Sequence, residues 1–209
     1  MRYIMIKLKV PFYLQSTAFT CDPACLMMAL KYFYPRCVLS RSLEFEIWRE
    51  AYGIGISGCM PQGLAYSALK RGLNATLICK KKRIIQISEK LATGYNREIA
   101  LFTSKRLLKE ARKRGMRIID TSPDMKDIEK ALAADSIPIV MINMRLLHNL
   151  NSPHWVIVIG LDERLVWIND PYDRKGKGLS IAKENFLEMM NDLNKYTQID
   201  KRILLVSKA

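Results

Sequence analysis

The order of predicted secondary structure indicates an α+β fold, in which a helical lobe (about residues 12–135) precedes an antiparallel β-sheet lobe (about residues 136–209). Apolar residues of the front half recur mostly at helical spacing. The rear half instead contains short runs rich in Val and Ile, which are typical of strands. No linker, repeat or low-complexity tract divides residues 1–209, so we expect a single domain with a cleft between its lobes.

The front half begins with a helix at Cys21. Asp22 and Pro23 favour a helix start, because proline fits the first helical turn, and the apolar run at 26–33 continues the helix. Cys21 is therefore expected at a helix N-terminus. Ser40 can cap a second helix that ends near residue 51. Further helices are expected over residues 61–71, 97–114 and 125–134, and a strand over residues 73–79.

Four strands and one helix are predicted in the rear half. The strands cover residues 137–143, 154–160, 165–169 and 199–206, and the helix covers residues 182–193. A turn at residues 162–163 joins the second strand to the third. If Gly160 pairs with Arg164, the register of this hairpin places His154 opposite Asp170.

Composition bounds the class of protein. A chain of 209 residues that is 49% hydrophobic can bury one sizeable core. Its cysteines are odd in number and lack zinc-type spacing, which favours a reducing, cytoplasmic location. They are Cys21, Cys25, Cys37, Cys59 and Cys79. The N-terminal apolar stretch is interrupted by lysines, so it has no signal-peptide core, and no apolar run is long enough for integral membrane association.

The positive charge is concentrated in one segment. The formal net charge is +14, and residues 80–117 carry 13 Lys or Arg against three Glu, which is +10 of that total. A solvated helix face is the simpler interpretation of this segment. The functional alternative is an anionic partner such as RNA or an acidic protein, although no stacking-aromatic motif accompanies the charge.

Four residues have the order and spacing of a thiol active site. Gln15 lies six positions before Cys21, His154 follows Cys21 by 133 positions, and Asp170 follows His154 by 16. A neighbouring imidazole can take the proton of a thiol, and a side-chain amide can hold the oxyanion formed on attack. A third group then fixes the tautomer of the imidazole. Cys21, His154, Asp170 and Gln15 are therefore the candidate catalytic residues.

Other residues that attract attention have simpler explanations. Cys25 lies one helical turn from Cys21 and is expected to pack in the core. His148, in a polar loop, is assigned to the surface or to gating. The chain has only two histidines, which argues against a zinc enzyme, and no metal or cofactor is expected. The glycines within residues 53–58 match G-x-G-x-x-G, but a helix precedes them, which favours a flexible loop over a dinucleotide site.

The sequence resembles a known family in its Cys, His and Asp motifs. The segments QSTAFTCDPACLMMALKYF, SPHWVIVIG and NDPY are similar to those of the bacteriocin leader-processing cysteine peptidases. LSRSLEFEIWREA and SGCMPQGLAYSALKRG resemble segments of stand-alone prokaryotic relatives of that family. The resemblance implies a papain-like cysteine proteinase fold, with Cys21 as nucleophile, His154 as base, Asp170 as orienting residue and Gln15 at the oxyanion hole.

Two features depart from the family pattern. The chain has no G-x-x-x-x-G-K-[ST] loop and no membrane helix, so it contains no transporter domain. Asp22 also replaces the glycine that usually follows the nucleophile. Its carboxylate would oppose thiolate formation if it faced Cys21. The interpretation we favour is that Asp22 caps the helix and points away from the thiol.

We therefore expect a cytoplasmic cysteine peptidase or amidase that cleaves a peptide or isopeptide bond through a Cys21 acyl-enzyme. One alternative is an acyl transferase of transglutaminase type, which uses the same site and passes the acyl group to an amine. The other is a catalytically inactive basic protein that binds RNA or an acidic partner through residues 80–117. Asp22 is the main support for this last alternative.

Overall fold

A seven-strand path forms the centre of the protein, in a computed structural model that describes residues 5–54, 58–85 and 93–209. The front half contributes β1 (Ile6–Lys7), α1 (Cys21–Phe33), α2 (Arg41–Ala51), α3 (Pro61–Lys70), β2 (Leu73–Cys79), α4 (Gly94–Lys113), β3 (Arg117–Asp120) and α5 (Met125–Ala133). The rear half contributes β4 (Ile137–Asn143), α6 (Arg145–His148), β5 (Pro153–Leu161), β6 (Leu165–Asn169), β7 (Leu179–Ala182), α7 (Lys183–Asp192) and β8 (Ile203–Lys208).

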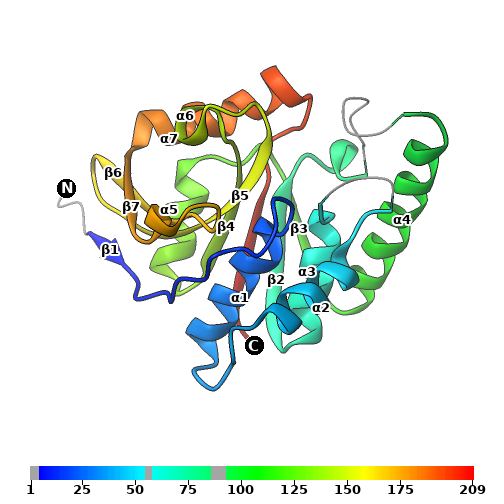
Figure 1. Cartoon of the computed structure of the whole chain (residues 1–209), viewed down its shortest axis with the longest axis horizontal. Helices are drawn as coiled ribbons and strands as arrows, with labels where there is room; N and C mark the ends of the chain where they lie inside the picture. Colours follow the sequence, from blue (N-terminus) through cyan, green and yellow to red (C-terminus); the bar gives the residue numbers. More distant parts are fainter. Residues whose placement is uncertain (1–4, 55–57, 86–92) are drawn as a thin grey trace.

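The strands lie in the order β3-β2-β8-β4-β5-β6-β7, and β1 pairs with β5 outside this path (Figure 1). The β2–β3 pair is parallel and the other pairs are antiparallel, so the sheet is mixed. This arrangement confirms the predicted α+β class. The sheet also includes strands from the predicted helical lobe (about residues 12–135), because β2 pairs with β8 of the rear half.

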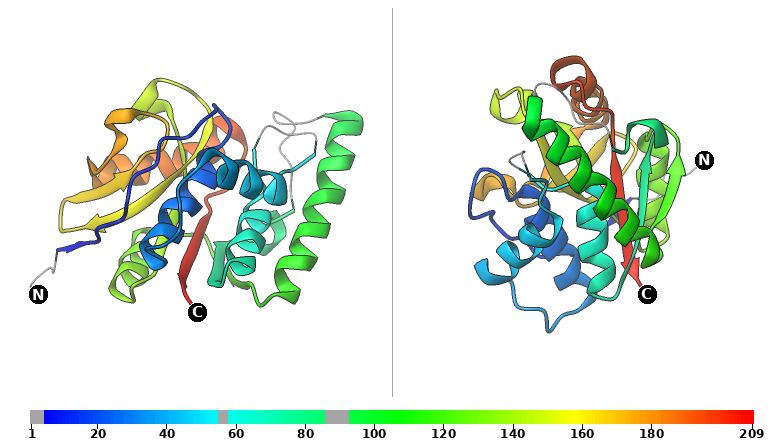
Figure 2. Two further views of the ribbon diagram at one scale, coloured as in Figure 1. Left: turned by 60° about the horizontal axis from the view of Figure 1, so that its bottom comes forward. Right: turned by 90° about the vertical axis from the view of Figure 1, so that its right-hand side faces the viewer.

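Helices cover both faces of the sheet, because its central strands bury side chains on alternate sides. Ile139, Trp155 and Ile157 belong to the apolar cluster that α1 and α3 complete. Val140 and Val156 belong to a second cluster, completed by α5 and α7. Figure 2 shows α4 as an outer helix beside α3, with which it packs. No helix in the described ranges is long and apolar enough to cross a membrane.

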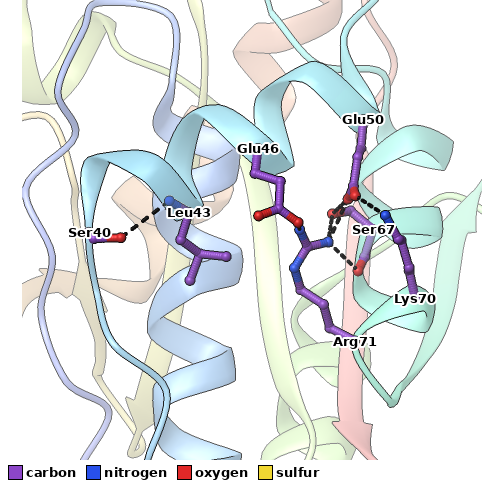
Figure 3. A network of polar contacts seen from close by, with 7 residues as sticks. All are labelled: Ser40, Leu43, Glu46, Glu50, Ser67, Lys70 and Arg71. Atoms are coloured by element: carbon purple, nitrogen blue, oxygen red, sulfur yellow. Dashed lines mark hydrogen bonds and ion pairs between the residues drawn. The ribbon is translucent and has the colours of Figure 1, made fainter.

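Polar contacts join α2 to α3 (Figure 3). Glu50 of α2 accepts hydrogen bonds from Ser67 and Lys70 of α3 and from Arg71, which follows α3. Arg71 also contacts Glu46. Ser40 caps α2 as predicted, since its hydroxyl accepts a hydrogen bond from the Leu43 amide.

Most predicted elements are confirmed, but the hairpin register is wrong. Gly160 pairs with Trp167 and not with Arg164, and the register shifts between Val158 and Gly160. His154 is instead the cross-strand partner of Ile142 in β4. The last strand is also shifted, since β8 begins at residue 203 and not at residue 199. Strands β1, β3 and β7 and helix α6 were not predicted.

A prediction concerns Gly63 of α3, which lies against Ala51, the last residue of α2. An added Cβ at Gly63 would lie 2.6 Å from the Ala51 carbonyl oxygen and 2.7 Å from its Cα. We expect Gly63→Ala to lower the free energy of unfolding by about 1–3 kcal/mol, because the helices must separate even though alanine favours helix formation. Urea unfolding measures this change. The control is Gly58→Ala, where an added Cβ meets no described atom within 4 Å; equal stability of the two variants would contradict the prediction.

Candidate active site

His154 and Asp170 form a buried, hydrogen-bonded pair. His154 lies in β5, and Asp170 follows directly after the last residue of β6. The His154 Nε2 atom lies 2.7 Å from Asp170 Oδ1, which also accepts a hydrogen bond from the Tyr172 amide at 3.0 Å. Burial opposes ionisation of Asp170, but the hydrogen bond and charge of His154 outweigh it and lower the pKa of this carboxyl to about 2. Asp170 is therefore ionised at neutral pH.

The backbone around Asp170 is also fixed. Its amide donates to the Gly176 carbonyl oxygen at 2.9 Å, which closes the turn after β6. A Cβ at Gly176 would collide with the Asp170 carbonyl, so only glycine fits here without a shift of the backbone. The predicted contact between His154 and Asp170 is made by their side chains and not by strand pairing, because the β5–β6 ladder ends at Asn169.

Cys21 is the first residue of α1, as predicted. The helix packs on β5, where Cys25 Sγ, fully buried as expected, donates to the Trp155 carbonyl oxygen at 3.3 Å. Burial raises the pKa of the Cys21 thiol well above its ordinary value, and the Asp22 carboxylate raises it further. The backbones of Trp155 and Asp22 act in the opposite direction. The candidate thiol thus lies beside Trp155, the residue that follows His154, and is held in its neutral, protonated form.

Asp22 does not cap its own helix, so that prediction is wrong. The N-cap of α1 is Thr20, without a side-chain capping bond. Asp22 Oδ2 instead accepts a hydrogen bond of 2.8 Å from the Cys59 amide, and Oδ1 lies 3.9 Å from Cys21 Sγ. Burial raises the pKa of Asp22 to about 6, despite the hydrogen bonds from Cys59. The carboxylate therefore faces the thiol and opposes thiolate formation.

Gln15 lies on the segment between β1 and α1. Its amide donates to the Pro171 carbonyl oxygen at 2.9 Å, beside Asp170. The next residue is tied to Glu44 of α2, which is fully buried and accepts hydrogen bonds from the Ser16 amide, the Ser16 hydroxyl and the Tyr13 hydroxyl. These contacts fix the main chain on both sides of Gln15. A buried carboxylate on α2 thus helps to place the candidate oxyanion donor.

The side-chain amide of Gln15 is oriented by its own loop. Nε2 donates to the Thr17 carbonyl oxygen at 2.7 Å, and Oε1 is buried without a partner among the described residues. A primary amide carries two N–H donors. The bond to Thr17 uses one donor and fixes the plane of the amide.

The chain matches the model of a known protein family. The model described as the Peptidase_C39-like family matches residues 10–202. The chain belongs to the Peptidase_C39-like family. A search of curated proteins found no match. Membership of this family supports a papain-like cysteine peptidase, in agreement with the resemblance seen in the sequence.

Solved structures of Peptidase_C39 type share the fold. A double glycine motif protease from an AMS/PCAT transporter, solved in complex with the leader peptide, matches with a TM-score of 0.52 and 17% identity over 99% of both chains. A structure described as a putative C39-like peptidase from Bacillus anthracis matches with a TM-score of 0.53 and 14% identity over 99% of both chains. These likenesses establish the papain-like peptidase fold for this family member.

His148 is the residue of the site that sequence reasoning missed. Its Nε2 atom lies 2.7 Å from Asp170 Oδ2, so one carboxylate contacts both histidines of the chain. The His148 side chain is only 15% exposed, and its ring packs on Tyr172 with centroids 4.6 Å apart. The predicted surface position is therefore wrong, because His148 is mostly buried and contacts Asp170. Within the described ranges, no group of three His, Cys, Asp or Glu has an arrangement that could hold a metal ion.

The other residues noted in the sequence lie elsewhere. Most of the basic segment forms α4 and its flanks, while residues 86–92 lie outside the described ranges. Gly53 donates its amide to the Gly58 carbonyl, and Tyr52 bridges to Cys59. The flexible loop predicted for residues 53–58 includes Gly55, which lies outside the described residues.

A prediction concerns the charge of Asp22. Asp22→Asn keeps an acceptor oxygen for the Cys59 amide but removes the negative charge beside the thiol. We expect the pKa of Cys21 to fall and its alkylation by iodoacetamide at pH 7 to become several-fold faster. Site-resolved mass spectrometry over a pH series measures this rate. The matched control is Asp135→Asn. Asp135 accepts a hydrogen bond from the hydroxyl of Tyr32, which lies at the opposite end of α1 from Cys21. An unchanged Cys21 profile in Asp22→Asn would contradict the prediction.

The same variant should also be more stable at neutral pH. An aspartate in the unfolded chain ionises near pH 4, whereas folded Asp22 has a pKa of about 6, so its contribution to stability falls as the pH rises from about 4 to about 6. Asp22→Asn removes this loss, and we expect a gain of up to about 3 kcal/mol at pH 7 but little gain at pH 4. Denaturant melts at the two pH values measure the difference. Equal changes at both values would show that the carboxylate is not destabilised by burial.

Proposed function

We propose that this protein is a cysteine peptidase or amidase that cleaves a peptide or isopeptide bond through an acyl-enzyme on Cys21. The observation that carries this proposal is the buried His154–Asp170 hydrogen bond of 2.7 Å on the strand against which α1 packs, with Cys21 at the start of α1. An ionised carboxylate that holds one ring nitrogen sets the tautomer of an imidazole base. Family membership supports the same chemistry.

The proposed first step couples deprotonation to attack. Asp170 occupies His154 Nε2, so Nδ1 is the nitrogen that would accept the thiol proton. Because the resting thiol is neutral, we propose that the proton moves to Nδ1 as Cys21 Sγ attacks the carbonyl carbon, and that no stable ion pair precedes attack. His154 then carries a positive charge that Asp170 stabilises.

The proposed oxyanion site combines Gln15 with the start of α1. The second N–H of Gln15 Nε2 would donate to the oxyanion, while the bond to Thr17 holds the amide in place. The first amides of a helix have no acceptor within that helix and would supply further donors. His154 then returns its proton to the leaving amine as the tetrahedral intermediate collapses to a thioester. Water, activated by His154, would hydrolyse the thioester and restore the thiol.

We propose a peptide or protein as substrate. The transporter protease with a matching fold was solved with a leader peptide, which supports this substrate class. We also propose a reducing compartment, the cytoplasm, since all five cysteines are free thiols. Hydrolysis and acyl transfer share every step up to the thioester, so the products must distinguish them.

The test is cleavage of a peptide library by wild type, Cys21→Ala and Cys37→Ala. Cys37 is a partly buried cysteine, so its variant is the matched control for loss of a thiol. We expect cleavage by wild type and Cys37→Ala, and a loss of at least about a hundredfold in Cys21→Ala. Parallel reactions with glycine amide distinguish acyl transfer by the mass of the product. Cleavage by Cys21→Ala at the wild-type rate, or none by wild type across the library, would count against the proposal.

A second candidate function rests on the exposed face of α4. Although the sequence contains no recognised stacking-aromatic motif, the structure leaves Tyr95 75% exposed and Phe102 66% exposed on the same helix as the basic residues. Tyr95, Phe102, Lys105, Lys109 and Arg112 are separated in turn by seven, three, four and three positions. This spacing places all five on one stripe of α4. A groove of about 540 Å³ adjoins this stripe, and its lining is four cations with two apolar residues. The lining residues are Ile85, Lys105, Leu108, Lys109, Arg112 and Lys113.

We propose single-stranded RNA as the partner of this stripe. Exposed aromatic rings offer stacking surfaces for bases, and neighbouring cations contact phosphates. An acidic protein would use the cations but would leave the two aromatic rings without a comparable role. This binding is independent of Cys21 and would not require the protein to be inactive.

Fluorescence anisotropy with a labelled twelve-nucleotide RNA tests this candidate. We expect Lys105→Gln/Lys109→Gln to weaken binding about tenfold and to reduce the dependence on salt, and Phe102→Ala to weaken it about fivefold. The matched control is Lys126→Gln/Lys130→Gln on α5, which removes the same charge from exposed positions elsewhere. Equal weakening by the control, or displacement of the RNA by polyglutamate at matched charge, would reject RNA as the partner.

A further inference from the structure

The carboxylate of Asp170 is shared between two histidines on different elements. Oδ1 contacts His154 Nε2 and the Tyr172 amide, while Oδ2 contacts His148 Nε2 at 2.7 Å. Asp170 is only 1% exposed, so water cannot easily replace a lost partner. His148 is the partner of Oδ2 among the described residues.

His148 is itself held in place by several contacts. It ends α6, the short helix in the connection between β4 and β5, and its amide donates to the Met144 carbonyl at 2.8 Å. Asn143 accepts from the Arg145 amide at the start of this helix. The Arg145 guanidinium bonds to Asp192 and Glu188 of α7. The connection is thereby anchored to α7, and His148 is directed at Asp170.

We propose that His148 is a positioning residue for catalysis, which donates a hydrogen bond to Asp170 Oδ2 and so fixes the plane of the carboxylate that orients His154. This inference rests on the proposed pairing of Cys21 with His154. A carboxylate held at Oδ1 alone can rotate about its Cβ–Cγ bond, and the imidazole that it holds then loses its alignment. A second donor at Oδ2 removes this freedom.

The ring contact between His148 and Tyr172 offers a competing explanation that experiment can separate. The two rings pack with centroids 4.6 Å apart, so a merely structural role would require the ring of His148 and not its N–H. His148→Phe keeps an aromatic ring but cannot donate. His148→Gln loses the ring but places an amide N–H where His148 Nε2 lies. The two variants therefore give opposite results under the two explanations.

The experiment measures alkylation of Cys21 by iodoacetamide against pH in wild type, His148→Gln, His148→Phe and His154→Ala, with melting temperatures for each. We expect His148→Phe to lower the rate at pH 7 about tenfold and to shift the profile, and His148→Gln to stay within about threefold of wild type. Wild-type profiles in both His148 variants, or loss in His148→Gln with rescue in His148→Phe, would overturn the inference.

Two further results separate this inference from the proposed function. If His154→Ala has the wild-type profile, Cys21 and His154 are not a pair, and both proposals fall. If His154→Ala is slow while His148→Phe is normal, only the role of His148 falls. Should His148→Phe not fold, nitrogen-15 NMR of the wild-type imidazoles decides the matter. A His148 Nε2 atom without a bound proton would contradict the proposed donor, and a protonated, hydrogen-bonded Nε2 would support it.

Discussion

The contacts of one buried carboxylate determine how the candidate site is arranged. Asp170 lies outside any strand, and its side chain joins β5, the β4–β5 connection and the turn after β6 through His154, His148 and the Tyr172 amide. An uncompensated buried charge would cost several kcal/mol, so these donors are a condition for placing an ionised group there. Gly176 also contributes to the position of Asp170. A side chain at residue 176 would displace the main chain of Asp170.

The sequence allowed correct prediction of elements whose formation depends on local pattern. Residues 73–79, 137–143 and 165–169 are strands within the predicted bounds, since buried runs rich in Val, Ile and Leu carry their own preference. Strand β3 was missed because it is an exposed, charged four-residue segment that becomes a strand only through parallel pairing with β2. The hairpin register failed because the turn is longer than predicted: Leu161 pairs with Val166, so residues 162–165 separate these paired residues, and the irregularity between Val158 and Gly160 then shifts the register again.

The candidate site was predicted in its residues but less well in its contacts. The spacing of His154 and Asp170 identified a pair that the structure brings together, whereas the roles of Cys21 and Gln15 stay predictions. Asp22 was misjudged because a capping residue is judged from its immediate neighbours, while its actual partner is the amide of Cys59, 37 positions later. His148 was missed for a similar reason. Its contact with Asp170 depends on how the β4–β5 connection folds back, which a polar loop sequence does not specify.

The position of β8 within the sheet has a consequence for biosynthesis. This strand, the last in the sequence, lies between β2 and β4, so the front and rear parts of the path join only through it. Such pairings between distant segments are slow to form, because the chain between them must first be ordered. On the ribosome, residues 73–79 and 137–143 therefore wait for residues 203–208 to emerge. Until then each of these strands has an open edge, and unpaired strand edges are the sites at which a folding intermediate is prone to aggregate.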